Sequence, residues 1–335
     1  MKRRMVLLLI LLKYCFQKKM PVWNTYKCLR EVGRERREDV LYLIQIDYLN
    51  NQQADSFVSY NEYVDISVQI NGVEAGDLLD NKTTLYKRCP HLLGRECLVL
   101  TECTEEQKLN FIKGHRQFVG KRNYGRFAQQ FSCYDTSKQS VEEILKGIQE
   151  NKQVLLEEYI VQHEKVSQLY PHSVNTIRLH TMNNGEEVRM FLKPKMRLGA
   201  NGSVVDANGT KGSYRLLLNL DGTVEMAVQL NKWSRAKQVR VHHDTGAELM
   251  KVQIPYVEEA IALVKEAAMY FPELPYIGWD VAITPKGPVI VEGNYISGAT
   301  STYQIMKFFS DGIGIRQELE KMLAFCTKGK SLEEK

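Results

Sequence analysis

The chain has 335 residues, of which 44% are hydrophobic and 25% charged, and its formal net charge is +5. This composition is typical of a soluble globular protein of about two domains, and it excludes a low-complexity or repeat protein. The basic excess is spread along the chain, so it is compatible with anionic substrates such as nucleotides but too dilute to indicate a nucleic-acid-binding surface.

The N-terminal stretch carries eight apolar residues, Met5 to Leu12, with basic residues on both sides. This run is far shorter than the roughly 20 residues that span a bilayer, and no small-residue cleavage site follows it, so secretion is disfavoured. A packed helix is the first interpretation, and a basic membrane-surface anchor or a true start at Met20 are the alternatives. The helical spacing of apolar residues after Asp39 predicts a mostly helical lead-in up to about residue 75.

The helices of the next segment are marked at their starts. A polar stretch from Asp80 to Lys87 predicts a short helix that carries Lys82 and Lys87, and on this evidence alone both are interpreted as surface lysines. Capping boxes at residues 104–107 and 140–143 predict two further helices.

A basic loop separates two predicted strands, Gln117 to Lys121 and Phe127 to Tyr134. The loop, Arg122 to Arg126, contains one glycine, Gly125. A basic, glycine-bearing loop between antiparallel strands can fold over phosphates, because its backbone N–H groups and its side-chain charge both attract them.

The next strand, Gln153 to Ile160, runs into two acids, Glu157 and Glu158. The backbone groups at such a strand end have no partner strand and could read the edge of an adenine. Glu164, one short segment further on, could accept hydrogen bonds from ribose hydroxyls. Without other evidence, these acids are better interpreted as solvated charges at a strand end.

Alternation with period two predicts a strand from Ser173 to Thr181, and Asn183-Asn184-Gly185 predicts a turn into a return strand, Val188 to Leu198. Polar and basic side chains share one face of each strand: Thr176, Arg178 and His180 on the first, and Lys193, Lys195 and Arg197 on the second. Such a face is usually exposed to water, but it can also line a polyphosphate cleft, where charge-assisted hydrogen bonds are strong. His180 has no neighbour that marks it as a general base and is interpreted as structural.

Two more features follow before the last hairpin. The first is a long loop, Gly199 to Ser213, which contains Asp206, Asn208 and Lys211. A loop of this length between strands is either disordered or functional. The second is an amphipathic helix, Pro255 to Tyr270, with proline at its predicted first position.

A late hairpin, Gly278 to Asn294, carries the most specific pattern of the chain. With a three-residue turn, Pro285-Lys286-Gly287, Asp280 pairs across the strands with Glu292, and Asn294 follows on the same face. Two opposed carboxylates weaken a sheet unless a cation lies between them. Mg²⁺ prefers oxygen ligands and accompanies phosphates, so the three side chains predict a nucleotide-bound metal site. The alternative is a solvated polar face on a surface hairpin.

The seven cysteines are placed irregularly and form no CxxC pair or metal-ligand spacing. This placement favours reduced thiols in a cytosolic protein over a disulfide framework.

Taken in order, these elements resemble the ATP-grasp fold. The succession is a strand ending in lysine, a loop, a strand ending in Glu-Glu-Tyr-Ile, a strand with Asn-Thr-Ile-Arg, and a hairpin with Asp followed by Glu-x-Asn. More narrowly, Ser173 to Arg178, Gly278 to Asp280 and Glu292 to Asn294 are similar to the ATP-grasp family associated with sugar transfer. The likeness covers about residues 80 to 325.

The resemblance implies an α+β fold in which two lobes with antiparallel sheets hold ATP between them. It divides the chain into a helical lead-in (1–75), a first lobe with the phosphate loop and adenine hinge (76–160), a second lobe with the metal site (161–325) and a charged tail (326–335).

The resemblance also implies roles for individual side chains. Asp280, Glu292 and Asn294 would hold Mg²⁺, or Mn²⁺, against the phosphates of ATP. Lys121 would contact the α- and β-phosphates, and either Lys82 or Lys87 would be the upstream nucleotide lysine. Glu157, Glu158, Tyr159 and Ile160 would form the adenine hinge, and Glu164 would bind the ribose. Arg178 and Lys193 would face the γ-phosphate. The chain departs from the family at Lys121-Arg122 and Gly125, where a lysine-proline pair and a glycine-rich loop are usual.

The implied function is an ATP- and Mg²⁺-dependent carboxylate-amine (or similar) ligase that acts through an acyl-phosphate in cell-envelope or extracellular polysaccharide biosynthesis. Small-molecule or sugar-linked acids and amines are the expected substrates, glycosyltransferases of the same pathway the expected partners, and the cytoplasm or the inner membrane face the expected location. No nucleic acid is expected. An ATP-grasp phosphotransferase and a degenerate nucleotide-binding partner of a glycosyltransferase are the alternatives.

Overall fold

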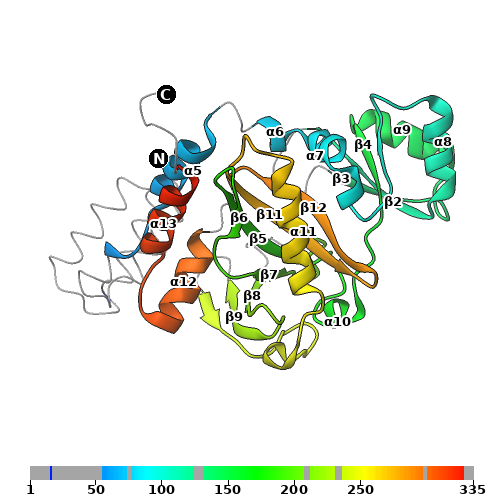
Figure 1. The fold of residues 1–335 in the computed structure, drawn as a ribbon. Coiled ribbons are helices and arrows are strands. Elements are labelled where there is room, and N and C mark those ends of the chain that lie inside the picture. The colour runs from blue at the N-terminus through cyan, green and yellow to red at the C-terminus, as the bar shows by residue number, and fades with distance from the viewer. Residues whose placement is uncertain are drawn as a thin grey trace.

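The computed structural model describes residues 16, 55–73, 77–123, 131–206, 212–230, 236–296 and 300–327. The apolar stretch Met5 to Leu12, the helix predicted after Asp39 and the tail from residue 328 lie outside these residues. Two antiparallel sheets, each with its own helices, form two lobes, and Figure 1 shows the first lobe on the right and the second in the centre and on the left. No helix in the described part of the chain has the length and apolar character that crossing a bilayer requires.

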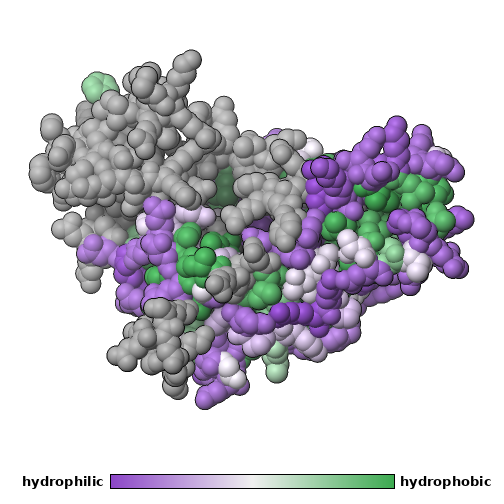
Figure 2. Space-filling view, turned by 90° about the horizontal axis from the view of Figure 1, so that it is seen from above, coloured by the Kyte–Doolittle hydropathy of each residue, from purple (hydrophilic) through white to green (hydrophobic). Residues whose placement is uncertain are grey.

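The first lobe is a four-stranded sheet with the strand order β1-β4-β2-β3. Its strands are β1 (Cys97–Val99), β2 (Gln117–Lys121), β3 (Phe131–Asp135) and β4 (Leu155–Glu158). Two helices, α8 (Glu105–Gly114) and α9 (Val141–Glu150), pack on this sheet and begin with the predicted capping boxes at Thr104 and Ser140. The short helices α6 (Asp77–Asp80), α7 (Lys82–Arg88) and η2 (Pro90–Leu92) precede the sheet. Seen from above, polar side chains cover much of this lobe, with apolar patches between them (Figure 2).

The second lobe is an eight-stranded sheet with the order β10-β9-β8-β7-β5-β11-β12, and β6 pairs with β5 off this path. Its strands are β5 (Thr176–Asn183), β6 (Val188–Met190), β7 (Lys195–Leu198), β8 (Tyr214–Leu218), β9 (Val224–Leu230), β10 (Ala236–Gln238), β11 (Tyr276–Thr284) and β12 (Gly287–Asn294). Its helices are α10 (Glu164–Ser167), η5 (Leu249–Lys251), α11 (Val257–Met269), α12 (Thr300–Asp311) and α13 (Arg316–Cys326). An N-terminal helix, α5 (Tyr60–Asn71), joins this lobe, because its Tyr63 is buried with Tyr276 of β11 and Leu319 of α13.

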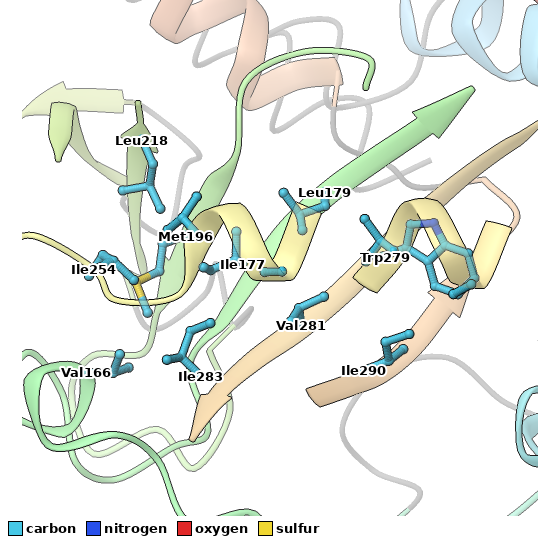
Figure 3. Close-up of a cluster of buried hydrophobic side chains, with 14 of the residues drawn as sticks. Val166, Ile177, Leu179, Met196, Leu218, Ile254, Trp279, Val281, Ile283 and Ile290 are labelled. Atoms are coloured by element: carbon cyan, nitrogen blue, oxygen red, sulfur yellow. The ribbon is translucent and has the colours of Figure 1, made fainter. Parts of the chain in front are cut away.

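One face of the second sheet packs against α11 and forms the largest core of the protein. Ile177 and Leu179 of β5 and Trp279 and Val281 of β11 point to this face (Figure 3). Because strand side chains alternate between the two faces, the even-numbered neighbours of these residues lie on the opposite face. The hydrophobic side of the sheet thereby determines where its polar side chains converge.

The sequence predicted one continuous return strand, Val188 to Leu198, and this prediction is wrong. The chain forms two short strands, β6 and β7, and Leu192 between them has a left-handed backbone with φ of 66°. This break interrupts the alternation, and Lys193 falls between the two strands, so the alternation does not assign it to one face with Lys195 and Arg197. A period-two pattern cannot show such a break.

The late hairpin has the predicted pairing but not the predicted turn. Thr284 pairs with Gly287, so the turn has two central residues, Pro285 and Lys286, instead of three. A β-bulge between Asp280 and Val281 then shifts the register by one residue and brings Asp280 opposite Glu292. The predicted pair is therefore confirmed, although a bulge rather than the turn produces it.

Two smaller expectations have different outcomes. Helix α11 begins at Val257, after the N-cap residue Tyr256, so Pro255 precedes the helix and does not occupy its first position. Five cysteines in the described part of the chain, Cys89, Cys97, Cys103, Cys133 and Cys326, are free thiols.

Candidate functional site

A cleft lies where α7 and the first sheet meet β12 at the edge of the second sheet. It is lined by Leu79, Asn81, Lys82, Leu85, Tyr86, Lys121, Glu157, Val291, Glu292 and Gly293. Its empty volume is about 260 Å³, which includes space open to solvent. The cleft thus brings together charged side chains from three separate parts of the chain.

Lys82, and not Lys87, lies in this cleft. Asn81 caps α7 by accepting a hydrogen bond from the backbone N–H of Thr83, and Lys82 follows as the first helical residue. Its Nζ atom lies 2.9 Å from Oε2 of Glu292. Lys87, more than one turn later, forms an ion pair with Glu102 outside the cleft. The structure therefore separates the two lysines that the sequence could not distinguish.

Glu157 is the centre of a buried ionic network. Its Oε1 atom lies 2.7 Å from Nζ of Lys121, its Oε2 atom lies 3.0 Å from Nη2 of Arg95, and the hydroxyl of Tyr86 donates to it. Burial by itself raises the pKa of Glu157, but the charges of Lys121 and Arg95 outweigh it and lower the pKa to about 2. The carboxylate is therefore fully engaged within the protein, and the backbone of Glu157 pairs in register with Cys97 of β1 and Val119 of β2, so neither remains for an adenine.

Strand β4 ends at Glu158, whose backbone N–H donates to the carbonyl of Glu96 at 2.9 Å, and beyond it the chain leaves the first sheet. Glu158 and Tyr159 are exposed and Ile160 is partly buried. In the described part of the chain, the backbone groups of Tyr159 and Ile160 make no hydrogen bond to other backbone groups. The N–H of His163 then donates to the carbonyl of Ile283, which ties this connection to the second sheet. Unpaired backbone groups at this strand end are what an adenine-reading hinge requires.

Glu164 is exposed at the start of α10, where Gln168 donates a hydrogen bond to it at 3.1 Å. Of the predicted basic loop, the structure describes Arg122 and Asn123, and Tyr124, Gly125 and Arg126 lie outside the described residues. Arg122, at its start, donates from Nε to the carbonyl of Asn151 at 2.6 Å.

Asp280 is buried between two arginines on the polar face of the second sheet. Arg178 donates to both of its carboxylate oxygens at 2.6 and 3.0 Å, and Nη2 of Arg197 lies 2.6 Å from Oδ2. Burial raises the pKa of Asp280, but the charges of Arg178 and Arg197 outweigh this effect and hold the pKa well below its usual range. Asp280 is therefore a permanent anion held by two cations.

The predicted metal ligands come together at one end of β11 and β12. Asp280 and Glu292 pair across the strands, and Nδ2 of Asn294 lies 3.5 Å from Oδ2 of Asp280. Two carboxylates and one amide suit a hard cation such as Mg²⁺ in their chemistry. Lys82 neutralises Glu292, and Arg178 and Arg197 neutralise Asp280. A bound metal ion would therefore either displace these basic side chains from the carboxylates or bind beside them. The donor set fits the metal.

Lys193 lies apart from this cluster. It is exposed and forms an ion pair with Glu225 of β9. Lys195, two residues later, is instead 3% exposed, and its Nζ atom lies 4.0 Å from the ring centroid of Tyr303. Lys193 directly follows the backbone break at Leu192 and lies outside both strands, whereas Lys195 is the first residue of β7.

Sequence reasoning missed Arg95 and Arg215, which are both buried. Arg215 is 7% exposed on β8, where it is the only charged residue of the apolar strand Tyr214–Leu218. A lone charge within a buried strand is a signal that could have been used, because charged residues are almost never buried without a partner. Arg95 follows no such pattern, and only the fold shows its partner.

His180 has the structural position expected of it. It is 1% exposed, and its Nδ1 atom lies 2.7 Å from the hydroxyl of Tyr276. Burial, supported by the charges of Arg178 and Lys195, lowers the pKa of His180 well below its usual value. The imidazole is therefore neutral at physiological pH.

Comparison with known proteins gives one family match. The model of a family described as sugar-transfer associated ATP-grasp matches residues 116–322, which is more than half of the chain. No curated protein matches the chain.

Several solved structures share parts of the architecture. A D-alanine-D-alanine ligase from Coxiella burnetii is 12% identical, with a TM-score of 0.39 over 76% of this chain and 59% of that one. An N5-carboxyaminoimidazole synthetase from Staphylococcus aureus, complexed with ADP, is 10% identical, with a TM-score of 0.38 over 65% of this chain and 45% of that one. D-alanyl-alanine synthetase A from Vibrio cholerae is 15% identical, with a TM-score of 0.44 over 75% of this chain and 66% of that one. The chain spans about half the length of the first two, and at these values the matches carry no argument of their own.

Proposed function

The chain belongs to the sugar-transfer associated ATP-grasp family and has its two-lobed fold, and from this premise we propose that it is an ATP- and Mg²⁺-dependent ligase that joins a carboxylate to an amine. The observation that carries the proposal is the convergence of Lys82, Lys121 and Glu292 in one cleft beside the Asp280 cluster. Separate lobes contribute these side chains, as a site that grips a nucleotide between two sheets requires.

Each part of the site has a role in this proposal. Lys82 and Lys121 bind phosphate oxygens, the backbone of Tyr159 and Ile160 reads the adenine, and Glu164 accepts from the ribose. Asp280, Glu292 and Asn294 would hold Mg²⁺, which neutralises phosphate charge and orients the transferring group when it is bound. Arg178 and Arg197 would face the γ-phosphate, so Arg197 takes the place that the resemblance implied for Lys193.

The reaction proceeds in two steps. A carboxylate oxygen of the acid attacks the γ-phosphorus of ATP, ADP leaves, and an acyl-phosphate forms. The amine then attacks the acyl carbon, the phosphate leaves with its bonding electrons, and the amine loses a proton to solvent. Catalysis of this kind depends on positioning and on neutralising the charge of the phosphoryl group, so it does not need a histidine base.

The acid and the amine are the parts that the fold does not determine. The family description associates its members with sugar transfer, which supports sugar-linked substrates in the synthesis of an envelope or extracellular polysaccharide. A cytoplasmic location, alone or at the inner membrane face beside glycosyltransferases, belongs to the same proposal.

Trapping the acyl-phosphate tests the reaction. With ATP, Mg²⁺, a panel of sugar acids and hydroxylamine, the protein should form ADP and a hydroxamate in equal amounts for the acid that it accepts. Hydroxylamine intercepts an acyl-phosphate but not a phosphate ester. ADP together with a stable phosphorylated product would indicate a phosphotransferase. Failure to bind ATP with Mg²⁺ would refute both the ligase and the phosphotransferase.

Substitution of the two upstream lysines tests the cleft. We expect Lys82→Ala to weaken the binding of ATP with Mg²⁺ by about 10-fold to 100-fold, because a hydrogen bond to a charged group contributes about 1.5–3 kcal/mol. Lys87→Ala, the matched control on the same helix, should change the Kd by less than about twofold, since its ion pair is exposed. Isothermal titration calorimetry measures both. Equal effects of the two substitutions would show that the cleft is not the nucleotide site.

A further inference from the structure

The chain passes between the two lobes twice, and the two passages lie side by side. It enters the first sheet at Cys97 of β1 and leaves it after Glu158 of β4. The backbone N–H of Glu158 donates to the carbonyl of Glu96 at 2.9 Å, which holds the two passages together. We call residues 93–96 and 159–163 the crossing. The orientation of the first sheet relative to the second lobe therefore depends on how the crossing is held.

Arg95 lies within the crossing, and its guanidinium contacts four separate parts of the chain. Nε and Nη2 donate to Oε2 of Glu157 at 3.1 and 3.0 Å, and Nη2 also donates to the hydroxyl of Tyr86 at 2.8 Å. Nη1 donates to the carbonyl of Leu93 at 3.0 Å and to that of Ile290 at 2.6 Å. These five contacts use the full donor capacity of a guanidinium. Arg95 thereby joins the last strand of the first sheet to α7 and to β12, the edge strand of the second sheet.

The backbone beside Arg95 lies close against β12. Gly94 has φ of 65°, and a Cβ atom added to it would lie 2.6 Å from Cγ1 of Val289. A larger residue would be strained there both by its left-handed backbone and by this contact. Gly94 therefore allows the segment that carries Arg95 to approach β12 closely enough for the hydrogen bond to Ile290.

The contacts of Arg95 are shielded from water. The side chains of Arg95 and Glu157 are each 3% exposed, whereas those of Lys82 and Glu292, which also join α7 to β12, are 20% and 34% exposed. Hydrogen bonds between charged groups are strong, and salt screens a buried pair less than an exposed one. We therefore expect Arg95 to hold β12 more firmly than Lys82 does.

Arg95 is linked to both sides of the nucleotide cleft, although it is not among the residues that line it. In the first sheet, Glu157 binds Nζ of Lys121 through Oε1 at 2.7 Å. In β12, Ile290 precedes Glu292 by two residues. A single buried side chain thus connects the lysine and the acid that face each other across the cleft.

We infer that Arg95 is a positioning residue, which fixes the orientation of the first sheet relative to β12 and with it the spacing of Lys121 and Glu292 across a bound nucleotide. The inference rests on the proposed function, because that function places phosphates between these two side chains. Arg95 acts through Glu157 and Ile290 and does not touch the nucleotide. Without its contacts, the first sheet would adopt several orientations, and a fraction of them would bind ATP.

Distances between spin labels test this inference. Non-natural amino acids, which leave the cysteines unmodified, carry the labels at Glu106 of α8 and Glu259 of α11, two exposed positions on different lobes. Double electron–electron resonance is recorded with and without AMP-PNP and Mg²⁺. Arg95→Lys keeps the charge but has a single nitrogen, so it cannot make all the contacts of a guanidinium. Gly94→Ala displaces the same segment from β12. Arg116→Lys, at an exposed position of the first lobe, is the matched control.

Without nucleotide, we expect one narrow distance distribution for the wild type and Arg116→Lys, and a broader one for Arg95→Lys and Gly94→Ala. AMP-PNP with Mg²⁺ should narrow the broad distributions, because a ligand shifts the population toward the orientation that binds it. If that orientation falls to about a tenth of the population, the apparent Kd for AMP-PNP with Mg²⁺ rises about tenfold. Adenosine, which needs the hinge but not both sides of the cleft, should bind the variants as it binds the wild type. Calorimetry measures both affinities.

Two results would overturn the inference. The first is an unchanged distance distribution in Arg95→Lys and Gly94→Ala proteins that unfold cooperatively. The second is an equal loss of affinity for adenosine and for AMP-PNP, which would show that Arg95 only stabilises the first lobe. Failure of the wild type to bind AMP-PNP with Mg²⁺ would refute the proposed function separately, because the distance distributions without nucleotide still report the orientation of the first sheet.

Discussion

Glu292→Gln is expected to reduce ATP-dependent turnover by about 100-fold or more while the protein keeps its stability. Glutamine preserves the shape of the side chain but removes the charge that would hold Mg²⁺ against the phosphates, and losing one such electrostatic contact costs about 10²–10³ in rate. The ion pair with Lys82 is partly exposed, so its loss should change the free energy of unfolding by less than about 1 kcal/mol. ADP release and urea unfolding measure the two quantities.

Asp280→Asn is not an equivalent test, although it removes the other predicted carboxylate ligand. Asp280 is 1% exposed and holds both Arg178 and Arg197, so the substitution leaves two buried cations without their shared anion. Breaking a buried pair from one side costs about 3–5 kcal/mol, and a fall in stability would accompany any loss of activity. Glu186→Gln, at an exposed turn, is the control for both variants. Native turnover by Glu292→Gln would refute the metal site.

Glu157→Gln is expected to lower the free energy of unfolding by about 3–5 kcal/mol at pH 7. The side chain is buried among Arg95, Lys121 and Tyr86, and the neutral amide would leave a buried guanidinium and an ammonium without an anion. Its exposed neighbour, Glu158→Gln, should change this free energy by less than about 0.5 kcal/mol. Urea unfolding at pH 7 compares the two variants. A small effect of Glu157→Gln would show that the network does not stabilise the first lobe.

The same carboxylate makes stability depend on pH. The pKa of Glu157 falls from 4.5 to about 2 on folding, so its ionised form stabilises the folded protein. The contribution, about 3 kcal/mol, is fully present above pH 4.5 and is lost as the pH falls from about 4.5 to 2. In the wild type, stability should therefore decline through this range more steeply than in Glu157→Gln. Parallel pH profiles for the two proteins would contradict the assignment.

The candidate site was predictable where its residues are close in the sequence. The hairpin pattern placed Asp280, Glu292 and Asn294 together, because side chains two residues apart share one face of a strand. The capping boxes of α8 and α9 follow from contacts between residues three positions apart. The turn of the hairpin was predicted incorrectly. A three-residue turn without a bulge and a two-residue turn with a bulge both place Asp280 opposite Glu292, and the sequence pattern does not distinguish them.

The partners of the charged residues were not predictable. Lys82 and Lys87 have the same helical surroundings in the sequence, and only the approach of β12, more than 200 residues later, distinguishes them. The resemblance to the family implied Lys193 at the γ-phosphate, and the predicted unbroken strand placed it on one face with Lys195 and Arg197. In the structure Lys193 is exposed and follows the left-handed residue Leu192, whereas Lys195 and Arg215 are buried.

The sequence by itself determined the order of the elements and the placement of Asp280, Glu292 and Asn294 together on the late hairpin. These features depend on the geometry of neighbouring residues, which repeats regularly in helices and strands. The tertiary structure alone decided which lysine enters the cleft, which acid is neutralised within the first lobe, and which basic residues are buried in the second sheet. Electrostatic energy depends on the distances between charges and on their burial in the folded chain, and neither quantity follows from the order of the residues alone.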